Sequence, residues 1–301
     1  MTTPPLRRPI PGISNLRDLG GYAVRGGSLR WHTLYRSNEI YTTNANTLSQ
    51  LQTLGIRTLC DFRDDKQKQR VPIEISFNAN TKTIAAPISV SVLIRSALSG
   101  EKLTGTSARK ILADIYRSLV LDHADAYKLF FNSILDPNNF PLAFCCVAGK
   151  DRTGLAAALL LPALGASRDV VFDDYLLTNT YWEMPTDVLT EESDDVREAV
   201  FTADIKYLEA AFAAMSECYG SAESFVQNVL GLNPALREAV LAQLVECQEN
   251  ALAAVGICLT RVSIDTDKDA HNAAALLYIV LWRGQVRWIC LCNPASVASA
   301  Q

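Results

Sequence analysis

One short stretch near the middle of the chain combines the side chains needed to hydrolyse a phosphate ester. In residues 144–154 a cysteine, Cys146, is followed after five further residues by an arginine, Arg152. A loop of that length can curl around a tetrahedral anion with its backbone N–H groups pointing inward, and a helix that starts directly behind the loop adds its positive dipole end. The same field favours thiolate over thiol, and the planar fork of an arginine can bind two anion oxygens. One segment would thus supply nucleophile, anion cradle and cation.

The residues on both sides of this stretch favour the geometry that such chemistry requires. Residues 142–144 indicate the end of a buried strand, and the apolar residues 155–164 indicate a buried helix. Gly149 relieves crowding inside the intervening loop. A simpler interpretation is that Cys145 and Cys146 are ordinary buried thiols and Arg152 a surface charge. The order of strand, loop and helix argues against it.

The rest of the chain alternates between strand-like and helix-like segments. The sequence predicts strands in residues 29–36, 56–62 and 142–144, and a strand followed by a loop in residues 81–92. It predicts helices in residues 47–54, 107–121, 124–135, 155–164, 168–181, 196–216, 222–230 and 233–249. A charged turn is expected at residues 63–66 and an acidic loop at residues 184–195. Strands that alternate with helices indicate an α/β fold with a mostly parallel central sheet flanked by helices.

Composition and charge exclude several other classes of protein. With 49% hydrophobic and 20% charged residues, the chain is typical of a globular protein with a sizeable core. The net charge of −4 gives no general attraction to nucleic acid. The longest late apolar run, residues 273–282, is too short to span a membrane. Eight cysteines without zinc-site spacing suggest neither a disulfide scaffold nor a metal site. We therefore expect no metal and no cofactor. We also expect a cytoplasmic location, because residues 1–9 lack the apolar core of a secretory signal and a free thiolate is stable in a reducing compartment.

Composition also divides the chain into three parts. Residues 1–12 are rich in proline and are expected to be mobile. Residues 13–249 carry the periodic segments and the loop, and form the predicted catalytic domain. Residues 250–301 combine tryptophan and cysteine without clear periodicity, and are predicted to be a poorly defined tail.

Five short motifs together resemble one family of enzymes. They are residues 15–22, 34–37, 61–63, 146–154 and 174–179. In type and order they resemble the atypical tyrosine and lipid phosphatases of bacteria and fungi (tyrosine phosphatase family 3), which carry a Gly-Lys-Asp-Arg-Thr-Gly P-loop. The resemblance covers about residues 10–247. It implies a cysteine-based, dual-specificity-like phosphatase fold with a helical lid. It also implies activity on phosphotyrosine proteins, in some members on phosphoserine, phosphothreonine or phosphoinositides.

The resemblance assigns a role to each residue of the loop. Cys146 would attack phosphorus and form a phosphocysteine, while Arg152 would stabilise the transition state. Asp151 is the favoured general acid, with pairing to a nearby Lys or Arg as the alternative. Asp61, at a predicted strand end, is the second candidate for the acid, with a salt bridge to Arg152 or Arg17 as its alternative. The remaining phosphate-binding positions are Val147, Ala148, Gly149, Lys150 and Thr153.

Two positions of the loop leave alternatives open. Lys150 would suit a substrate with a second phosphate, or would simply be a solvated lysine. Cys145 stands where the family usually has a histidine that holds the loop, and a thiol is only a weak donor. We expect a slower enzyme, and the alternative is a phosphate-binding protein without turnover. A Cys-His protease is disfavoured because no histidine has a matching context.

Overall fold

The computed structural model describes Ile10 and residues 13–40, 44–72, 80–90 and 103–246, together with the backbone of three strands between residues 258 and 290. The chain divides into two compact units, Met1–Glu246 and Cys247–Gln301. The N-terminal segment expected to be mobile lies outside the described residues, except for Ile10, which is buried.

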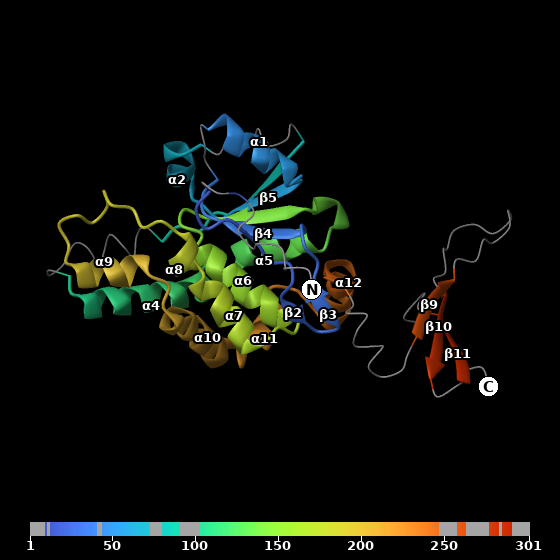
Figure 1. Ribbon diagram of the computed structural model, residues 1–301. Coiled ribbons are helices and arrows are strands. Elements are labelled where there is room, and N and C mark those ends of the chain that lie inside the picture. The colour runs from blue at the N-terminus through green and yellow to red at the C-terminus, as the bar shows by residue number, and fades with distance from the viewer. Residues whose placement is uncertain are drawn as a thin grey trace. The chain divides into compact units, whose positions relative to one another are not determined.

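A five-stranded sheet organises the first unit (Figure 1). Its order is β1 (Arg17–Asp18), β4 (Leu34–Ser37), β7 (Leu142–Cys145), β5 (Thr58–Asp61) and β6 (Lys82–Ala85). The last four strands run parallel, and only the short edge strand β1 is antiparallel. The prediction of a mostly parallel central sheet is therefore confirmed. Because parallel strands end at the same edge, the residues that follow β5 and β7 meet there.

Alternation along the strands separates the core into two clusters. On β7, Leu142 and Phe144 belong to the larger cluster, which includes the helices α5 (Ala124–Ile134) and α6 (Asp151–Ala163). Ala143 and Cys145 belong to the smaller cluster with α1 (Ala45–Thr53). This is the two-residue period expected of a strand buried on both faces. In Figure 1, α1 lies on one side of the sheet and α5 and α6 on the other.

The remaining long helices of the first unit pack on one another or on α6. Helix α4 (Gly105–Leu121) contacts both α9 (Asp194–Phe201) and α10 (Ile205–Tyr219), and α6 contacts α7 (Arg168–Leu176). The other helices are α2 (Asp65–Arg70), the 3-10 helix η1 (Pro137–Asn139), α8 (Thr178–Tyr181), α11 (Ala222–Ser224), the π-helix η2 (Phe225–Val229) and α12 (Pro234–Leu244). Side chains that accept hydrogen bonds from backbone N–H groups cap two of these helices: Thr104 caps α4 in a capping box, and Asn233 caps α12.

Several predicted elements differ from the structure. The helix predicted at residues 233–249 ends at Leu244 and is followed by strand β8 (Val245–Glu246), and the helix predicted at residues 168–181 is interrupted at Leu177. Residues 29–36 form two strands, β3 (Gly27–Leu29) and β4, because the chain turns between them with a left-handed His32 at φ 60°. The charged turn expected at residues 63–66 is the start of α2, where Asp64 completes a capping box. The predicted helix 196–216 is interrupted between α9 and α10, where Asp204 caps the second helix.

Two small sheets complete the described chain. In the first unit, β2 (Ala23–Val24), β3 and β8 (Val245–Glu246) form an antiparallel sheet. In the second unit, β10 (Leu277–Trp282) pairs antiparallel with both β9 (Cys258–Val262) and β11 (Gln285–Cys290).

Candidate active site

The loop between β7 and α6 is held from outside through its carbonyl groups. Three consecutive carbonyl oxygens accept hydrogen bonds from other parts of the fold: Val147 from Glu39 N (3.0 Å), Ala148 from Asn15 Nδ2 (2.8 Å) and Gly149 from Arg36 Nη2 (2.7 Å). Among the described residues, the N–H groups of these three residues donate to no other group. With its carbonyls turned outward, the loop leaves its amides for an anion, next to the N-terminus of α6.

Gly149 allows the loop to approach the end of β4. Its φ is +67°, in the left-handed region. A Cβ at this position would lie 2.5 Å from Ser37 O and 2.6 Å from Asn38 N, which are backbone atoms and cannot rotate away. The glycine is therefore required both by conformation and by space.

The two adjacent cysteines face different environments. Cys145 ends β7 on the side of α1, and its Sγ lies 3.9 Å from Asp61 Oδ1. Burial, followed by the neighbouring Asp61, raises the pKa of the Cys145 thiol well above its usual value. Cys146 lies on the other side, in the larger core cluster, and lines the cavity described below. Only Cys146 is therefore placed to react with a molecule in that cavity.

Arg152 is buried at the start of α6, and its Nη1 atom donates to neutral oxygens only. The acceptors are Phe62 O (3.2 Å), Ile88 O (3.0 Å) and Gln67 Oε1 (2.7 Å). No carboxylate among the described residues forms an ion pair with Arg152. Its positive charge is therefore left for an anion in the cavity.

Asp151 lies in the first turn of α6 and lines the same cavity. Its Oδ1 accepts a hydrogen bond from the Tyr116 hydroxyl at 2.9 Å and lies 3.4 Å from Lys150 Nζ. The Tyr116 hydroxyl is also 2.6 Å from that of Tyr175. Burial and the nearby Asp151 raise the pKa of Tyr116 well above its usual value, so this hydroxyl keeps its proton and donates. The carboxylate of Asp151 is thereby fixed in orientation.

Lys150 is not a solvated lysine. Its side chain is 1% exposed, and Nζ donates to the carbonyl oxygens of Val200 and Thr202 at the end of α9. The ammonium group also lies 5.8 Å from the centre of the Tyr207 ring. Lys150 therefore joins the loop to α9 instead of projecting freely at the mouth.

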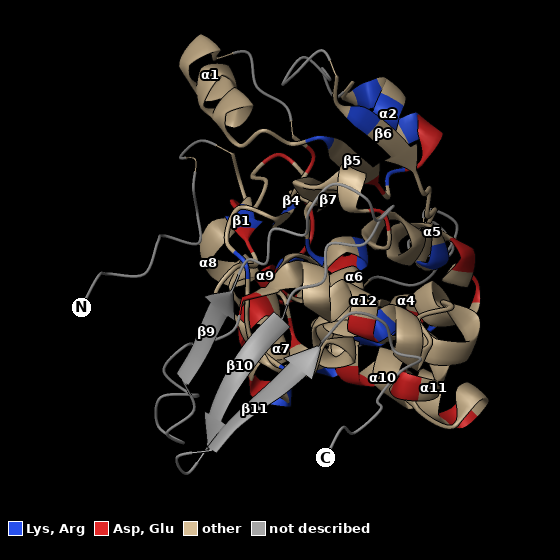
Figure 2. Ribbon diagram, turned by 90° about the vertical axis from the view of Figure 1, so that its right-hand side faces the viewer, with Lys and Arg blue, Asp and Glu red and all other residues tan. Residues whose placement is uncertain are grey.

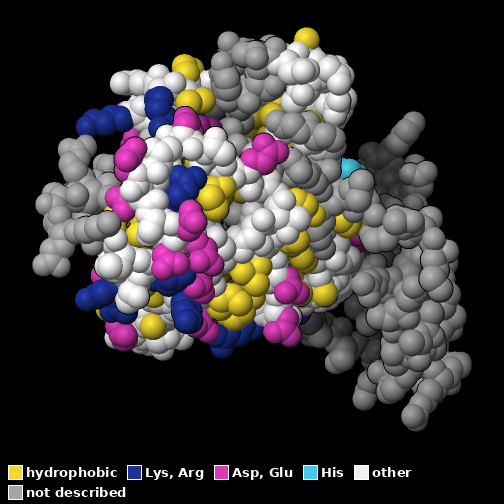
Figure 3. All heavy atoms as spheres, turned by 60° about the vertical axis from the view of Figure 1, so that its left-hand side comes forward, with side chains coloured by type: hydrophobic (Ala, Val, Ile, Leu, Met, Phe, Trp, Pro, Cys, Tyr) yellow, Lys and Arg dark blue, Asp and Glu magenta, His cyan; other side chains and the backbone are white. Residues whose placement is uncertain are grey.

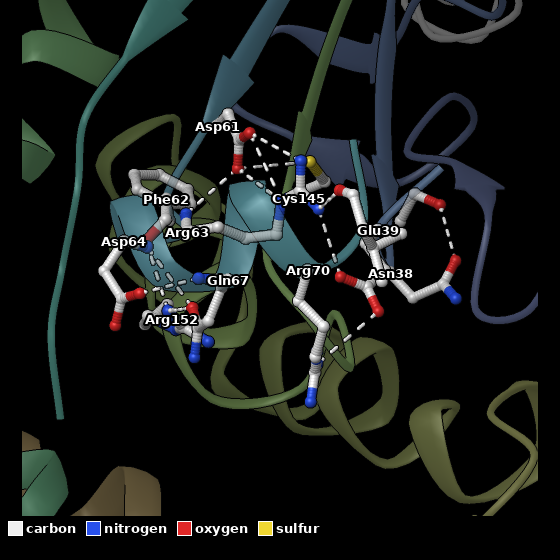
Figure 4. Close-up of polar contacts among 12 residues, drawn as sticks. Asn38, Glu39, Asp61, Phe62, Arg63, Asp64, Gln67, Arg70, Cys145 and Arg152 are labelled. Carbon is white, nitrogen blue, oxygen red and sulfur yellow. Dashed lines mark hydrogen bonds and ion pairs between the residues drawn. The ribbon is translucent and has the colours of Figure 1, made fainter. Parts of the chain in front are cut away.

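Asp61 ends β5 and forms an ion pair with Arg63. The alternative of a salt bridge from Asp61 to Arg152 or Arg17 is therefore wrong. Its carboxylate accepts hydrogen bonds from Nε and Nη2 of Arg63, both at 3.1 Å, and from the Arg63 backbone N–H at 2.9 Å (Figure 4). The register of β5 on β7 brings Asp61 beside Cys145. Asp61 does not line the cavity of Cys146.

Thr153 follows Arg152 in α6 and is fully buried. Its Oγ1 has no hydrogen-bond partner among the described residues. The hydroxyl remains a donor beside the loop.

A cavity of about 550 Å³ opens above the loop. Cys146, Val147, Ala148 and Arg152 line it together with apolar side chains of α4 and α9, among them Ile111, Leu112, Ile115, Val200 and Phe201. Trp182 and Leu189, from the segment between α8 and α9, add to this lining. Arg70, Glu39 and Asp187 supply charge around it. The cavity therefore combines an anion-binding loop with largely apolar walls.

A buried cluster of charges supports the loop from behind. Asp174 of α7 binds Arg17 Nε at 3.0 Å and Arg36 Nη1 at 2.5 Å. Burial alone would raise the pKa of Asp174, but the two arginines outweigh it and lower the pKa to about 2. Burial and the neighbouring Arg36 lower the pKa of Arg17 to about 10. Two cations and one anion leave a net positive charge beside Gly149.

Sequence reasoning gave no role to several residues that hold this site. Arg36 binds the loop, Tyr116 binds Asp151, and Gln67 binds Arg152. Gln67 had a local signal, since it stands three residues after Asp64, as in a capping box, and Arg36 lies in one of the five motifs, residues 34–37. The roles of Arg36 and Tyr116 are recognised only once distant segments are brought together.

The described residues show no group of His, Cys, Asp and Glu that could hold a metal ion. Among them, too, no helix has the length and apolar character of a membrane span. On the face shown in Figure 3, acidic and basic side chains are interspersed, with hydrophobic patches between them.

An anion-binding loop between a parallel strand and a helix, with a thiol at its start and an arginine at its end, defines a protein built like the cysteine-based phosphatases. The family model of the tyrosine phosphatase family matches residues 8–246. The chain belongs to the tyrosine phosphatase family, and the resemblance carried by the five motifs is confirmed. The expectation of a protein-tyrosine or dual-specificity phosphatase, a hydrolase, is confirmed with it.

Two sequence relatives agree with this assignment. The "Putative tyrosine-protein phosphatase" of Cupriavidus necator is 32% identical over 232 residues, which cover 74% of this chain and 84% of that protein. The triple specificity protein phosphatase PtpB of Mycobacterium tuberculosis is 26% identical, over 73% of this chain and 93% of its own. Among solved structures, the core catalytic domain of the PP-IP phosphatase SIW14 from S. cerevisiae, in complex with citrate, has a TM-score of 0.33 at 15% identity, covering 68% of this chain and 97% of that one.

Proposed function

We propose that this chain hydrolyses phosphate monoesters through a phosphocysteine on Cys146. The observation that carries the proposal is the loop itself. Its carbonyl groups accept hydrogen bonds from outside the loop, and within the described part of the chain the amides of residues 147–149 have no acceptor and Arg152, which closes the loop below the cavity, has no acidic partner. These are the parts needed to bind a phosphoryl group and stabilise its transition state.

The reaction would proceed in two balanced steps. Cys146 Sγ forms a bond to phosphorus while the bond from phosphorus to the ester oxygen breaks, and Asp151 gives that oxygen a proton. Water then attacks phosphorus, the sulfur–phosphorus bond breaks, and inorganic phosphate leaves as Asp151 takes a proton from the water. Asp151 is favoured over Asp61 because it lines the cavity, whereas Asp61 is bound to Arg63 outside it.

The lining of the cavity supports phosphotyrosine proteins as substrates. Apolar walls from α4 and α9 suit an aromatic ring above the loop. A second phosphate would lack the cation expected for it, because Lys150 is engaged with Val200 and Thr202. We therefore prefer phosphotyrosine over phosphoinositides as the substrate. Phosphoserine and phosphothreonine, whose side chains are shorter, are alternatives in the same cavity.

Hydrolysis of p-nitrophenyl phosphate tests the proposal. Cys146→Ser should abolish turnover and retain binding of phosphate analogues, and Cys145→Ser, its matched control, should keep appreciable activity. Arg152→Lys should lower kcat/KM by about a hundredfold or more, because a point charge cannot replace the planar fork. An active Cys146→Ser beside an inactive Cys145→Ser would show that the nucleophile is misassigned. Analogue binding without turnover in the unmodified chain would favour the phosphate-binding alternative.

A further inference from the structure

A second cavity lies at the C-terminal end of α6, whereas the anion-binding loop precedes the N-terminus of that helix. Its volume is about 200 Å³, and its walls come from α6, α10, α12 and the turn from α11 into η2. Figure 2 shows these helices together below the strands β4 and β7. Among the described residues, none lines both this cavity and the one above the loop. The two cavities are therefore separate sites.

Small apolar side chains leave this space open between the helices. Ala158, Ala163 and Ala222 each contribute no more than a methyl group to the walls, and Phe212 and Val226 add larger apolar surfaces. A cavity of about 150 Å³ with walls of this kind stays dry and holds benzene. The cavity at the end of α6 is larger, so it can accommodate an aromatic ring with one small substituent.

Arg237 of α12 is the basic residue of this lining, and one edge of its guanidinium is unused. Its Nη1 donates to Glu223 Oε1 at 3.0 Å. Its Nε is buried and has no hydrogen-bond partner in the described part of the chain, and Nη2 donates to none of the described groups either. The N–H groups of Nε and Nη2 lie parallel on one edge, which matches the two oxygens of a carboxylate. A buried N–H without an acceptor costs free energy, so a ligand that supplies the acceptor gains that free energy on binding.

We infer that this cavity binds a small aromatic carboxylate, with its ring against the alanines of α6 and its carboxylate on the Nε and Nη2 edge of Arg237. Glu223 also lines the cavity and already neutralises part of the charge of Arg237. It would repel a dianion such as phosphate more strongly than a ligand with one negative charge. The inference goes beyond the proposed function and does not depend on it.

Benzoate is the probe, and calorimetric titration of the full chain measures its Kd. Benzamide, which has nearly the same shape without the charge, is the comparison ligand. The titration is repeated with excess tungstate, a phosphate-shaped anion that competes for the anion-binding loop.

Three variants of the full chain locate the binding site. Arg237→Met removes the guanidinium and keeps an apolar side chain, whereas Ala163→Leu fills the cavity. Arg117→Met is the matched control, because Arg117 also pairs with a glutamate, Glu217 of α10, at 2.6 Å but does not line the cavity. Thermal melting of each variant shows whether it is folded. If Ala163→Leu does not fold, Arg237→Met and the tungstate titration still decide the test.

We expect benzoate to bind with a Kd of about 1 mM or below, in the range for a ligand of its size, and more tightly than benzamide. Arg237→Met should weaken benzoate binding by at least about tenfold, as the loss of hydrogen bonds to a charged group does. Arg117→Met should bind benzoate as the unmodified chain does, and Ala163→Leu should weaken the binding of both ligands. Excess tungstate should leave benzoate binding unchanged.

The inference is overturned if the Kd of benzoate exceeds about 10 mM, or if Arg237→Met binds benzoate within about twofold of Arg117→Met. It is also overturned if tungstate displaces benzoate, which would place the ligand in the cavity above the anion-binding loop. None of these measurements requires turnover, so a chain that hydrolyses nothing refutes the proposed function and leaves this test valid.

Discussion

Gly149 is a position in the loop at which any side chain would displace the backbone. We expect Gly149→Ala to lower kcat/KM by about a hundredfold, the size of effect that a displacement of about 1 Å produces at a reacting centre. One reason is that a Cβ would collide with Ser37 O and Asn38 N. The other is that the φ of +67° is unfavourable for alanine. Gly55→Ala is the matched control, since Gly55 has a φ of +61° and open space around its Cβ position. It should cost about 1–2 kcal/mol of stability without loss of activity; equal losses of activity in both variants would contradict the steric argument.

Cys145 raises a different question, because its side chain faces away from the cavity. Its thiol keeps its proton, as burial and Asp61 raise its pKa, and it is a weak donor to Asp61. An imidazole in Cys145→His can donate to Asp61 more strongly and stiffen the start of the loop. We expect higher kcat near neutral pH, measured as a pH–rate profile with p-nitrophenyl phosphate. An unchanged or slower variant would show that this loop is adapted to cysteine.

The elements that carry the loop are joined by Asp174, which connects α7 to β1 and β4. Asp174→Asn would leave Arg17 and Arg36 together without an acid. Breaking a buried ion cluster in this way costs about 3–5 kcal/mol, so the melting temperature should fall by about 6–20 °C for a unit of this size. The neighbouring Asp173 is exposed on the same helix, and Asp173→Asn should melt like the unmodified chain. Similar melting of the two variants would remove Asp174 from the support of the loop.

The same carboxylate predicts how stability depends on pH. A folded-state pKa of about 2, below the ordinary value of 3.8, means that folding favours the ionised form of Asp174. Its contribution, about 2 kcal/mol at ~1.4 kcal/mol per pKa unit, is present above about pH 4 and is lost as the pH falls from about 4 to 2. Urea unfolding at pH 5, 4 and 3 measures this loss. In Asp174→Asn this part of the acid dependence should be missing, and an identical dependence in both chains would contradict the assignment.

Local patterns were enough to predict the sheet and the loop, because both depend on near neighbours. The apolar run before Cys146 and the helix-forming run after Arg152 lie within a few residues of the loop. The support of the loop was beyond reach for the opposite reason. Lys150 donates to Val200 O, fifty residues away, and Arg36 donates to Gly149 O, 113 residues away. Lysine side chains are usually exposed to solvent. This general rule is wrong for Lys150, because α9 and the loop bury its side chain.

At the scale of the whole molecule, the question is where the catalytic unit ends. Strand β8 pairs with β3 through Val245 and Glu246, and Val245 is buried. Arg30 N also donates to Leu244 O at 2.8 Å. These bonds tie residues 244–246 to the N-terminal part of the same unit, which ends at Glu246. The strands β9, β10 and β11 pair only with one another among the described residues.

We therefore expect a chain truncated after residue 249 to fold and to retain its hydrolysis of p-nitrophenyl phosphate, whereas truncation after residue 243 should destabilise it. The second cut removes the pairing of β8 and exposes the edge of β3. Thermal melting and hydrolysis of both truncated chains, beside the full chain, measure the difference. A loss of more than about 8 °C in the longer truncation, which corresponds to about 2–4 kcal/mol for a domain of this size, would show that residues 250–301 stabilise the catalytic unit and that the boundary lies further along the chain.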